Sequence, residues 1–162
     1  MNNRFIALDF ETANYKRNSA CALSIVCVEN LIITEEFYTL IKPPENYFMF
    51  TDIHGITWND VREEPTFNDI WPDIQKYFKR IDFIAAHNSS FDKSVMEACC
   101  IHYGIKSPKT EYKCTLKLAR KKLNLKSYSL DKVSSYYGIE LEHHNALSDS
   151  LACAKIMINF MS

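Results

Sequence analysis

Three short segments carry carboxylates that could hold a metal ion, and the first is Asp9-Phe10-Glu11-Thr12. It ends an apolar stretch that we expect to form a strand. Side chains alternate along a strand, so Asp9 and Glu11 should share one face. Two desolvated carboxylates repel each other, and a bound divalent cation is the simplest way to offset that repulsion. For this segment alone, an ordinary strand end that leads into a turn is an equally good interpretation.

The second segment, 87–92 (HNSSFD), spans the change from an apolar strand to a helix. Asn88 is a candidate N-cap, and the positive end of the helix dipole favours Asp92 in the opening turns. Taken alone, a capped helix with an early aspartate is more often structural than catalytic. The role of His87 is left open by the sequence, because a histidine at a strand end can be a hydrogen-bonded core residue.

The third segment, 144–152 (HNALSDSLA), opens the last expected helix. Asp149 shares a helical stripe with Ala146 and Cys153, so it should face the core, where a carboxylate needs a counter-charge. His144 cannot lie on that stripe, since five residues turn a helix by about 500°. We expect it before the first turn, where the helix dipole disfavours imidazolium and helps to keep a neutral base.

The elements that position these segments form an α/β pattern, with strands first and then strands alternating with helices. Residues 4–10 are apolar on both faces, which predicts a central buried strand, and the next two β-rich runs should complete an antiparallel meander. This order favours a mixed sheet with helices on its faces. We expect strands at 4–10, 21–28, 31–41, 81–86 and 112–114, and helices at 66–78 (kinked at Pro72), 89–103, 115–123, 130–137 and 146–160.

Length and composition indicate one globular domain, 1–162, because 162 residues with 47% hydrophobic and 24% charged side chains suit one unit with a full core. No stretch is apolar for long enough to cross a bilayer, and the N-terminus lacks the layout of a signal peptide, so we expect a cytoplasmic protein without a membrane partner. The six cysteines show no CxxC spacing and should be reduced core thiols. A net charge of −1 predicts that any contact with nucleic acid is local.

Together the three segments resemble those of the DEDDh exonucleases, and most of all the group of the proofreading epsilon subunit of bacterial DNA polymerase III. The resemblance covers nearly the whole chain, since 54–57 (HGIT) and 114–120 (CTLKLAR) also match family segments. Many relatives have Asp where Cys114 stands, and we assign Cys114 no role. The tyrosine-type branch has Tyr four residues before the last Asp, where this chain has Asn145, so the histidine branch fits.

This resemblance implies a ribonuclease H-like fold, with a five-stranded sheet of three antiparallel strands followed by two parallel ones. It also implies 3′-5′ hydrolysis of nucleic acid to nucleoside 5′-monophosphates with two divalent cations, Mg²⁺ or, as a substitute, Mn²⁺. Asp9 would bridge both ions, Glu11 and Asp149 would hold the ion that binds the attacking water, and Asp92 would help to hold the ion near the leaving oxygen. His144 would accept the proton.

The resemblance also implies residues that hold the 3′-terminal nucleotide. Phe10, Thr12, His54 and Phe91 are similar in position to such residues, although core packing explains Phe91 equally well. The basic segment 106–126 could guide a phosphate backbone, and a solvated helix face is the more frequent explanation of such a pattern.

We expect DNA rather than RNA as the substrate. An exoribonuclease of the same fold, which trims RNA 3′ ends or short oligoribonucleotides, would use the same catalytic residues and is the alternative. A non-catalytic module docked on a polymerase is disfavoured, because all five catalytic positions are filled. Association with a polymerase, the strandedness of the substrate and the oligomeric state are left open by the sequence.

Overall fold

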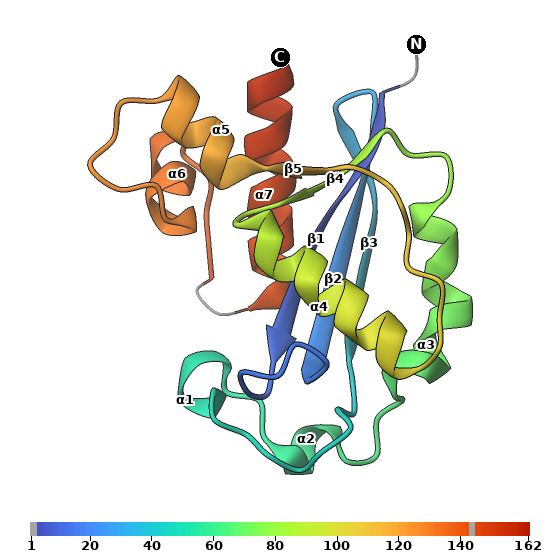
Figure 1. The fold of residues 1–162 in the computed structure, drawn as a ribbon. Helices are drawn as coiled ribbons and strands as arrows, with labels where there is room; N and C mark the ends of the chain where they lie inside the picture. The colour runs from blue at the N-terminus through green and yellow to red at the C-terminus, as the bar shows by residue number, and fades with distance from the viewer. Residues whose placement is uncertain (1–2, 143–144) are drawn as a thin grey trace.

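The structure is a computed structural model that describes residues 3–142 and 145–162, and it contains a five-stranded mixed sheet with helices on both faces (Figure 1). The strand order is β3-β2-β1-β4-β5, in which β1, β2 and β3 are antiparallel neighbours and β4 and β5 run parallel to β1. This topology confirms the predicted sheet. The strands are β1 (Arg4–Thr12), β2 (Ala20–Glu29), β3 (Ile32–Leu40), β4 (Phe83–Ala86) and β5 (Tyr112–Cys114).

The helices lie in two layers, with α7 on one face of the sheet and α3 and α4 on the other (Figure 1). None of the helices within the described residues combines the length and the apolar character that a membrane span requires. The helices are α1 (Thr51–His54), α2 (Trp58–Val61), α3 (Phe67–Ile74), the 3-10 helix η1 (Gln75–Phe78), α4 (Ser89–His102), α5 (Thr115–Lys122), α6 (Leu130–Tyr136) and α7 (Ala146–Met161).

The central strand β1 divides the core into two parts. Its side chains alternate between the faces of the sheet. Ile6, Leu8 and Phe10 pack with residues of α3 and α4, whereas Phe5 and Ala7 pack with residues of α7. Both faces of β1 are therefore buried, as the sequence predicts for a central strand.

Two features of the helices differ from the prediction. The expected helix 66–78 is divided, but Pro72 lies inside α3, and the change to 3-10 geometry comes after Ile74. Pro72 is exposed, whereas the stripe that includes Ile74 is buried and holds the helix on the core. The short helices α1 and α2 were not predicted, because four residues are too few to show a helical period.

Two predicted helix stops and the predicted thiols agree with the structure. Gly104 and Gly138 follow α4 and α6 with φ angles of 65° and 67°, a left-handed conformation that glycine adopts without steric cost. All six cysteines are free, and all except the half-buried Cys27 are buried. These thiols are therefore packing residues rather than disulfide partners.

Candidate metal centre and active site

Three of the predicted carboxylates meet beyond the middle of β1, toward its C-terminal end, which is the lower end in Figure 1. Asp9 and Glu11 alternate with Phe10 and so continue the face of β1 that packs against α7. One ligand oxygen each of Asp9, Glu11 and Asp149 lies within 4.8 Å of the others. Oxygens on opposite sides of a magnesium ion are about 4.2 Å apart, so a small inward movement would let the three carboxylates share one cation.

Helix α7 is held over the sheet by a serine that stands opposite Asp9. Ser24 of β2 pairs with Asp9 in the antiparallel register. Its hydroxyl donates to the carbonyl oxygen of Ala146 at 2.6 Å and lies 2.5 Å from the hydroxyl oxygen of Ser150. These buried contacts attach the first turn of α7 to β2, and they place Asp149 beside the carboxylates of β1.

The fourth carboxylate, Asp92, reaches the site from α4, on the opposite face of the sheet. The parallel pairing of β1 with β4 ends at Ala7 and Ala85, so the amide of Phe10 has no partner on β4. A buried N–H group requires an acceptor. Asp92 is 1% exposed, and its Oδ1 accepts a hydrogen bond from the Phe10 amide at 3.0 Å. Asp92 is thereby held next to Asp9, just outside the three-carboxylate cluster.

The turn before Asp92 differs from the prediction in how it begins the helix. Asn88 stands at the N-cap position with a φ of 68°, and its side chain accepts no hydrogen bond from a helix N–H. Its role is conformational, since asparagine tolerates the left-handed region better than most residues. His87 contacts the Thr115 hydroxyl and the Tyr128 carbonyl, both at 2.9 Å, and burial lowers its pKa. It is therefore a structural histidine.

The predicted general base, His144, lies outside the described residues. The described part of this region begins with Asn145, the N-cap of α7, whose side chain accepts a hydrogen bond from the Ser148 amide at 3.2 Å. In the sequence His144 directly precedes this cap. Its role as base stays a prediction.

The carboxylates of this site are strongly perturbed. Burial, with a contribution from Asp149, raises the pKa of Glu11 to about 7, and burial raises the pKa of Asp92 to about 8. The pKa of Asp9 lies well above its usual range because of burial and the charges of Asp92, Glu11 and Asp149. Within the described residues, the buried Oδ2 of Asp9 has no hydrogen-bond partner. A buried carboxylate oxygen without a donor, surrounded by like charges, fits a divalent cation as its partner.

A hollow of about 270 Å³ adjoins Glu11, and three of the four predicted substrate-binding residues line it. They are Thr12, His54 and the half-buried Phe91. The His54 ring accepts a hydrogen bond from the Ile56 amide at 3.1 Å, so its other nitrogen, Nε2, carries the proton and donates to the Thr12 carbonyl at 2.9 Å. A neutral His54 therefore ties the segment after α1 to the end of β1.

The side chain of Phe10 does not line this hollow, unlike those of the other three predicted substrate-binding residues, and a role of Phe10 in binding substrate stays a prediction. It is 2% exposed and lies in the core on the α3 and α4 face of the sheet. The reason is the alternation along β1, which places Phe10 on the opposite face from Glu11. Its backbone amide is also engaged, because it donates to Asp92.

Four residues of the hollow were not predicted from the sequence. Tyr15 and Arg17 come from the loop after β1, and Phe50 and Ile53 come from the start of α1. Tyr15 is 71% exposed and packs edge-on against Phe50. The only sequence feature that could have indicated Tyr15 and Arg17 is that an aromatic and a basic residue follow the first acidic segment within five residues.

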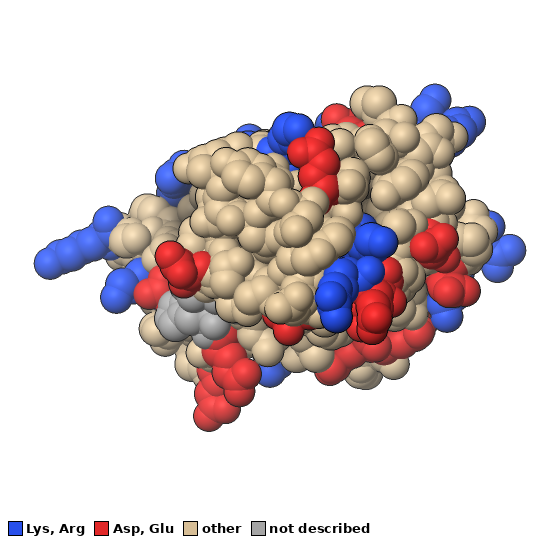
Figure 2. Space-filling view, turned by 90° about the horizontal axis from the view of Figure 1, so that it is seen from below, with Lys and Arg blue, Asp and Glu red and all other residues tan. Residues whose placement is uncertain are grey.

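The basic segment 106–126 contributes no residue to the carboxylate cluster or to the hollow. Lys113 lies over the ring of Phe83, at the start of β4, whereas the carboxylates lie toward the C-terminal end of β1. Viewed onto that end, the described surface shows separate acidic and basic side chains among large neutral areas, without an extended basic face (Figure 2). A role for this segment in guiding nucleic acid stays a prediction.

Comparison with known families agrees with this geometry. The family model described as Exonuclease (RNase_T) matches residues 6–157, nearly the whole chain. The chain belongs to this exonuclease family.

Named relatives of this exonuclease-family chain include two kinds of DNA polymerase III protein. The chain is 30% identical to DNA polymerase III subunit epsilon of Aquifex aeolicus, over 99% of this chain and 82% of that protein. It is 28% identical to the PolC-type DNA polymerase III of Thermotoga petrophila, over 99% of this chain. The chain spans only 12% of the length of that PolC-type relative.

A solved structure has the same fold. The complex of exonuclease X with 5′ overhanging duplex DNA superposes with a TM-score of 0.79 at 24% identity, over 97% of this chain and 90% of that one. This likeness confirms the predicted ribonuclease H-like fold of the exonuclease family.

Proposed function

We propose that this chain hydrolyses DNA from the 3′ end and releases nucleoside 5′-monophosphates. The observation that carries the proposal is the meeting of Asp9, Glu11 and Asp149 within 4.8 Å, around a buried Asp9 oxygen that has no hydrogen-bond donor among the described residues. Such a cluster of half-buried carboxylates is unfavourable unless it holds a cation. Membership of the exonuclease family supports the phosphodiester as the bond that is cleaved.

Divalent cations fit this donor set, and Mg²⁺ suits a site of carboxylate oxygens, with Mn²⁺ as a substitute. When bound, two such ions stabilise the entering and the leaving oxygen of an in-line displacement at phosphorus. Asp9 would contribute to both positions, Glu11 and Asp149 to one, and Asp92 to the other. The carboxyl groups with raised pKa values would release protons as the ions bind.

We assign the proton transfer to His144. A histidine with an ordinary pKa is partly neutral near pH 7 and can accept a proton from the attacking water. A position before the N-cap of α7 keeps it close to Asp149 along the chain, and the positive end of the helix dipole favours the neutral imidazole.

The hollow beside Glu11 is the place where we expect the 3′-terminal nucleoside. Its walls include the rings of Phe91, Phe50 and Tyr15. Aromatic rings can stack on any nucleobase, so such a site does not depend on the nucleotide sequence. The neutral, doubly hydrogen-bonded His54 contributes a rigid wall. This arrangement would hold one nucleotide at a time and would require a free strand end.

DNA is the substrate that we favour, because the chain is 30% identical to an epsilon subunit of DNA polymerase III over 82% of that protein. The same likeness supports association with a polymerase as a further proposal. Neither the carboxylate cluster nor the hollow discriminates between deoxyribose and ribose by itself.

The proposal predicts that DNA is degraded faster than RNA of the same sequence. Matched, end-labelled DNA and RNA oligonucleotides would be digested at equal concentrations with Mg²⁺ or Mn²⁺, and initial rates compared. Faster hydrolysis of the RNA would assign the chain to the exoribonuclease alternative. Hydrolysis of neither strand with either ion would support the non-catalytic alternative and contradict the proposed function.

A further inference from the structure

Arg17 lies at the edge of an acidic site and has no acidic partner among the described residues. Within residues 3–142 and 145–162, it is the only lysine or arginine that lines the hollow beside Glu11. No ion pair joins its exposed side chain to a carboxylate among the described residues. Its guanidinium carbon lies 4.9 Å from the centroid of the Phe91 ring. This cation–π contact positions the guanidinium group, whose N–H groups can still donate to a ligand.

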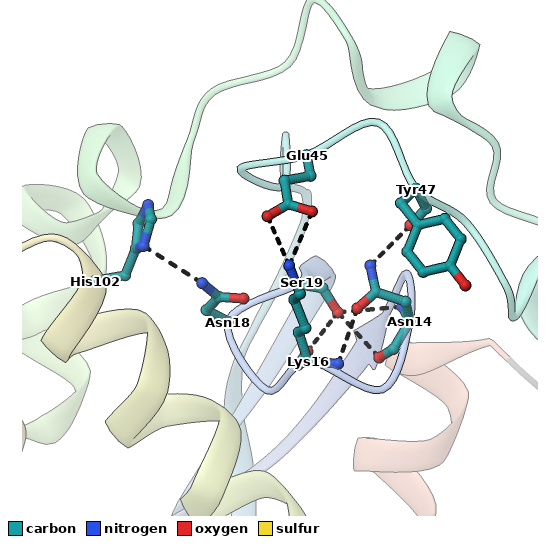
Figure 3. A network of polar contacts seen from close by, with 7 residues as sticks. All are labelled: Asn14, Lys16, Asn18, Ser19, Glu45, Tyr47 and His102. Atoms are coloured by element: carbon teal, nitrogen blue, oxygen red, sulfur yellow. Dashed lines mark hydrogen bonds and ion pairs between the residues drawn. The ribbon is translucent and has the colours of Figure 1, made fainter.

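The backbone that carries Arg17 is held by buried polar contacts (Figure 3). Asn14 is 2% exposed; its side chain donates to the Tyr47 carbonyl at 2.8 Å and accepts from the Lys16 amide at 2.8 Å. The Ser19 hydroxyl donates to the Lys16 carbonyl at 2.6 Å and accepts from the Asn14 amide at 3.1 Å. These contacts fix the chain on both sides of Arg17.

The same loop is also attached to α4, the helix that carries Phe91. The Asn18 side chain lies 3.4 Å from Nδ1 of His102 (Figure 3). The Cys99 thiol lies 4.0 Å from the Arg17 carbonyl. The loop that carries Arg17 and the helix that carries Phe91 are thus held together by direct contacts. A preorganised cation of this kind loses little conformational freedom when it binds an anion.

Lys16, the neighbour of Arg17, provides a contrast on the same loop. It is exposed, and its ammonium group is paired with Glu45 at 2.8 Å, so its charge is already compensated (Figure 3). Arg17 forms no such ion pair within the part of the chain that the structure describes. The two side chains therefore differ in their availability to an anion, although they are adjacent in sequence and carry the same charge.

We propose that Arg17 binds the phosphodiester next to the scissile one, on its 5′ side. The proposal rests on the proposed function, because it places the 3′-terminal nucleotide in the hollow and the scissile phosphate at the carboxylates. Arg17 stands on the loop after β1, whereas Asp149 lies in α7, and the guanidinium group of Arg17 contacts the Phe91 ring at the wall of the hollow. Guanidinium groups pair with phosphate oxygens through two parallel hydrogen bonds. Arg17 would thus make the enzyme prefer a strand to a single nucleotide ester.

The test compares a DNA oligonucleotide with the p-nitrophenyl ester of thymidine 5′-monophosphate, which has a cleavable bond but no second phosphodiester. Arg17→Gln should raise KM for the oligonucleotide by about 10- to 100-fold, the range for loss of a charge-assisted hydrogen bond, with little change in kcat. Arg17→Gln should hydrolyse the ester with the same KM and kcat as wild type. Arg17→Lys should recover part of the loss, and Lys16→Gln should behave as wild type on both substrates.

An equal loss on both substrates would overturn the proposal, because Arg17 would then act on the terminal nucleotide or on the shape of the site. Unchanged kinetics of Arg17→Gln on the oligonucleotide would overturn it as well. Both results presuppose an active wild type. A wild-type protein that cleaves neither substrate would instead refute the proposed function, and the Arg17 assignment with it. Because Arg17 is exposed, the melting temperature of the variant should match that of wild type.

Discussion

Asp9→Asn should reduce the rate of DNA hydrolysis by about a thousandfold or more. Asparagine keeps the shape of the side chain but removes the charge that is placed to bind the cations. Loss of metal-assisted stabilisation of the transition state is worth several kcal/mol, and each 1.36 kcal/mol is about a factor of ten in rate. Initial rates on an end-labelled oligonucleotide at saturating Mg²⁺ measure this loss.

The control for this variant is the stability of the metal-free protein as a function of pH. The folded pKa values of Glu11 (about 7) and Asp92 (about 8) lie above the unfolded values of about 4. The folded state therefore binds more protons than the unfolded state over this window. The stability of the fold that depends on protonated Glu11 and Asp92 is fully present below about pH 4 and is lost as the pH rises toward 8. Metal-free wild type should melt at a lower temperature at pH 8 than at pH 5.

Asp9→Asn should lose less stability over the same pH range, because asparagine cannot ionise and it removes one charge from the cluster. At pH 8 the metal-free variant should be at least as stable as metal-free wild type. A variant that melts well below wild type at pH 8 would contradict the proposed repulsion. Its loss of activity would then reflect damage to the fold rather than loss of a metal ligand.

His144→Ala should reduce kcat by about a hundred- to ten-thousandfold, the usual contribution of general-base catalysis. The affinity for Mn²⁺, measured by calorimetry, should stay close to that of wild type, since we propose that the carboxylates hold the cations. The wild-type rate should also rise with pH through an ionisation at about pH 6 to 7, because only the neutral imidazole accepts a proton.

His143→Ala is the matched control, since it removes an adjacent histidine that lies outside the family motif. It should keep near-normal activity. If His143→Ala were inactive and His144→Ala active, the motif would be misaligned by one residue. A large loss of Mn²⁺ affinity in His144→Ala would instead make this histidine a ligand rather than a base.

The sequence was sufficient for features that depend on a regular period. Alternation along β1 put Asp9 and Glu11 on one face, and the helical stripe of α7 turned Asp149 toward them. The structure brings these three carboxylates together. Their meeting was predictable because the direction of each side chain follows from the period of its own strand or helix, and the order of the elements brings these together.

Features that depend on the register of two strands or on contacts made by a loop were not predictable. The Phe10 amide donates a hydrogen bond to Asp92 because β1 continues past the end of its pairing with β4. The register between two strands cannot be deduced from the sequence of either strand alone. The position of Arg17 depends on loop contacts such as that of Asn14 with Tyr47. Neither contact has a local sequence signal.

The most direct test of the central claim is digestion of a 5′-labelled linear DNA strand beside a closed circular strand, with Mg²⁺ and with excess EDTA. With Mg²⁺ the linear strand should shorten in single-nucleotide steps from its 3′ end. The circle should survive, because we propose that the hollow beside Glu11 accepts a free strand end. With EDTA both should be intact, since the clustered carboxylates require cations to act on a phosphate. Full activity in EDTA, or cleavage of the circle, would contradict a metal-dependent 3′-5′ exonuclease.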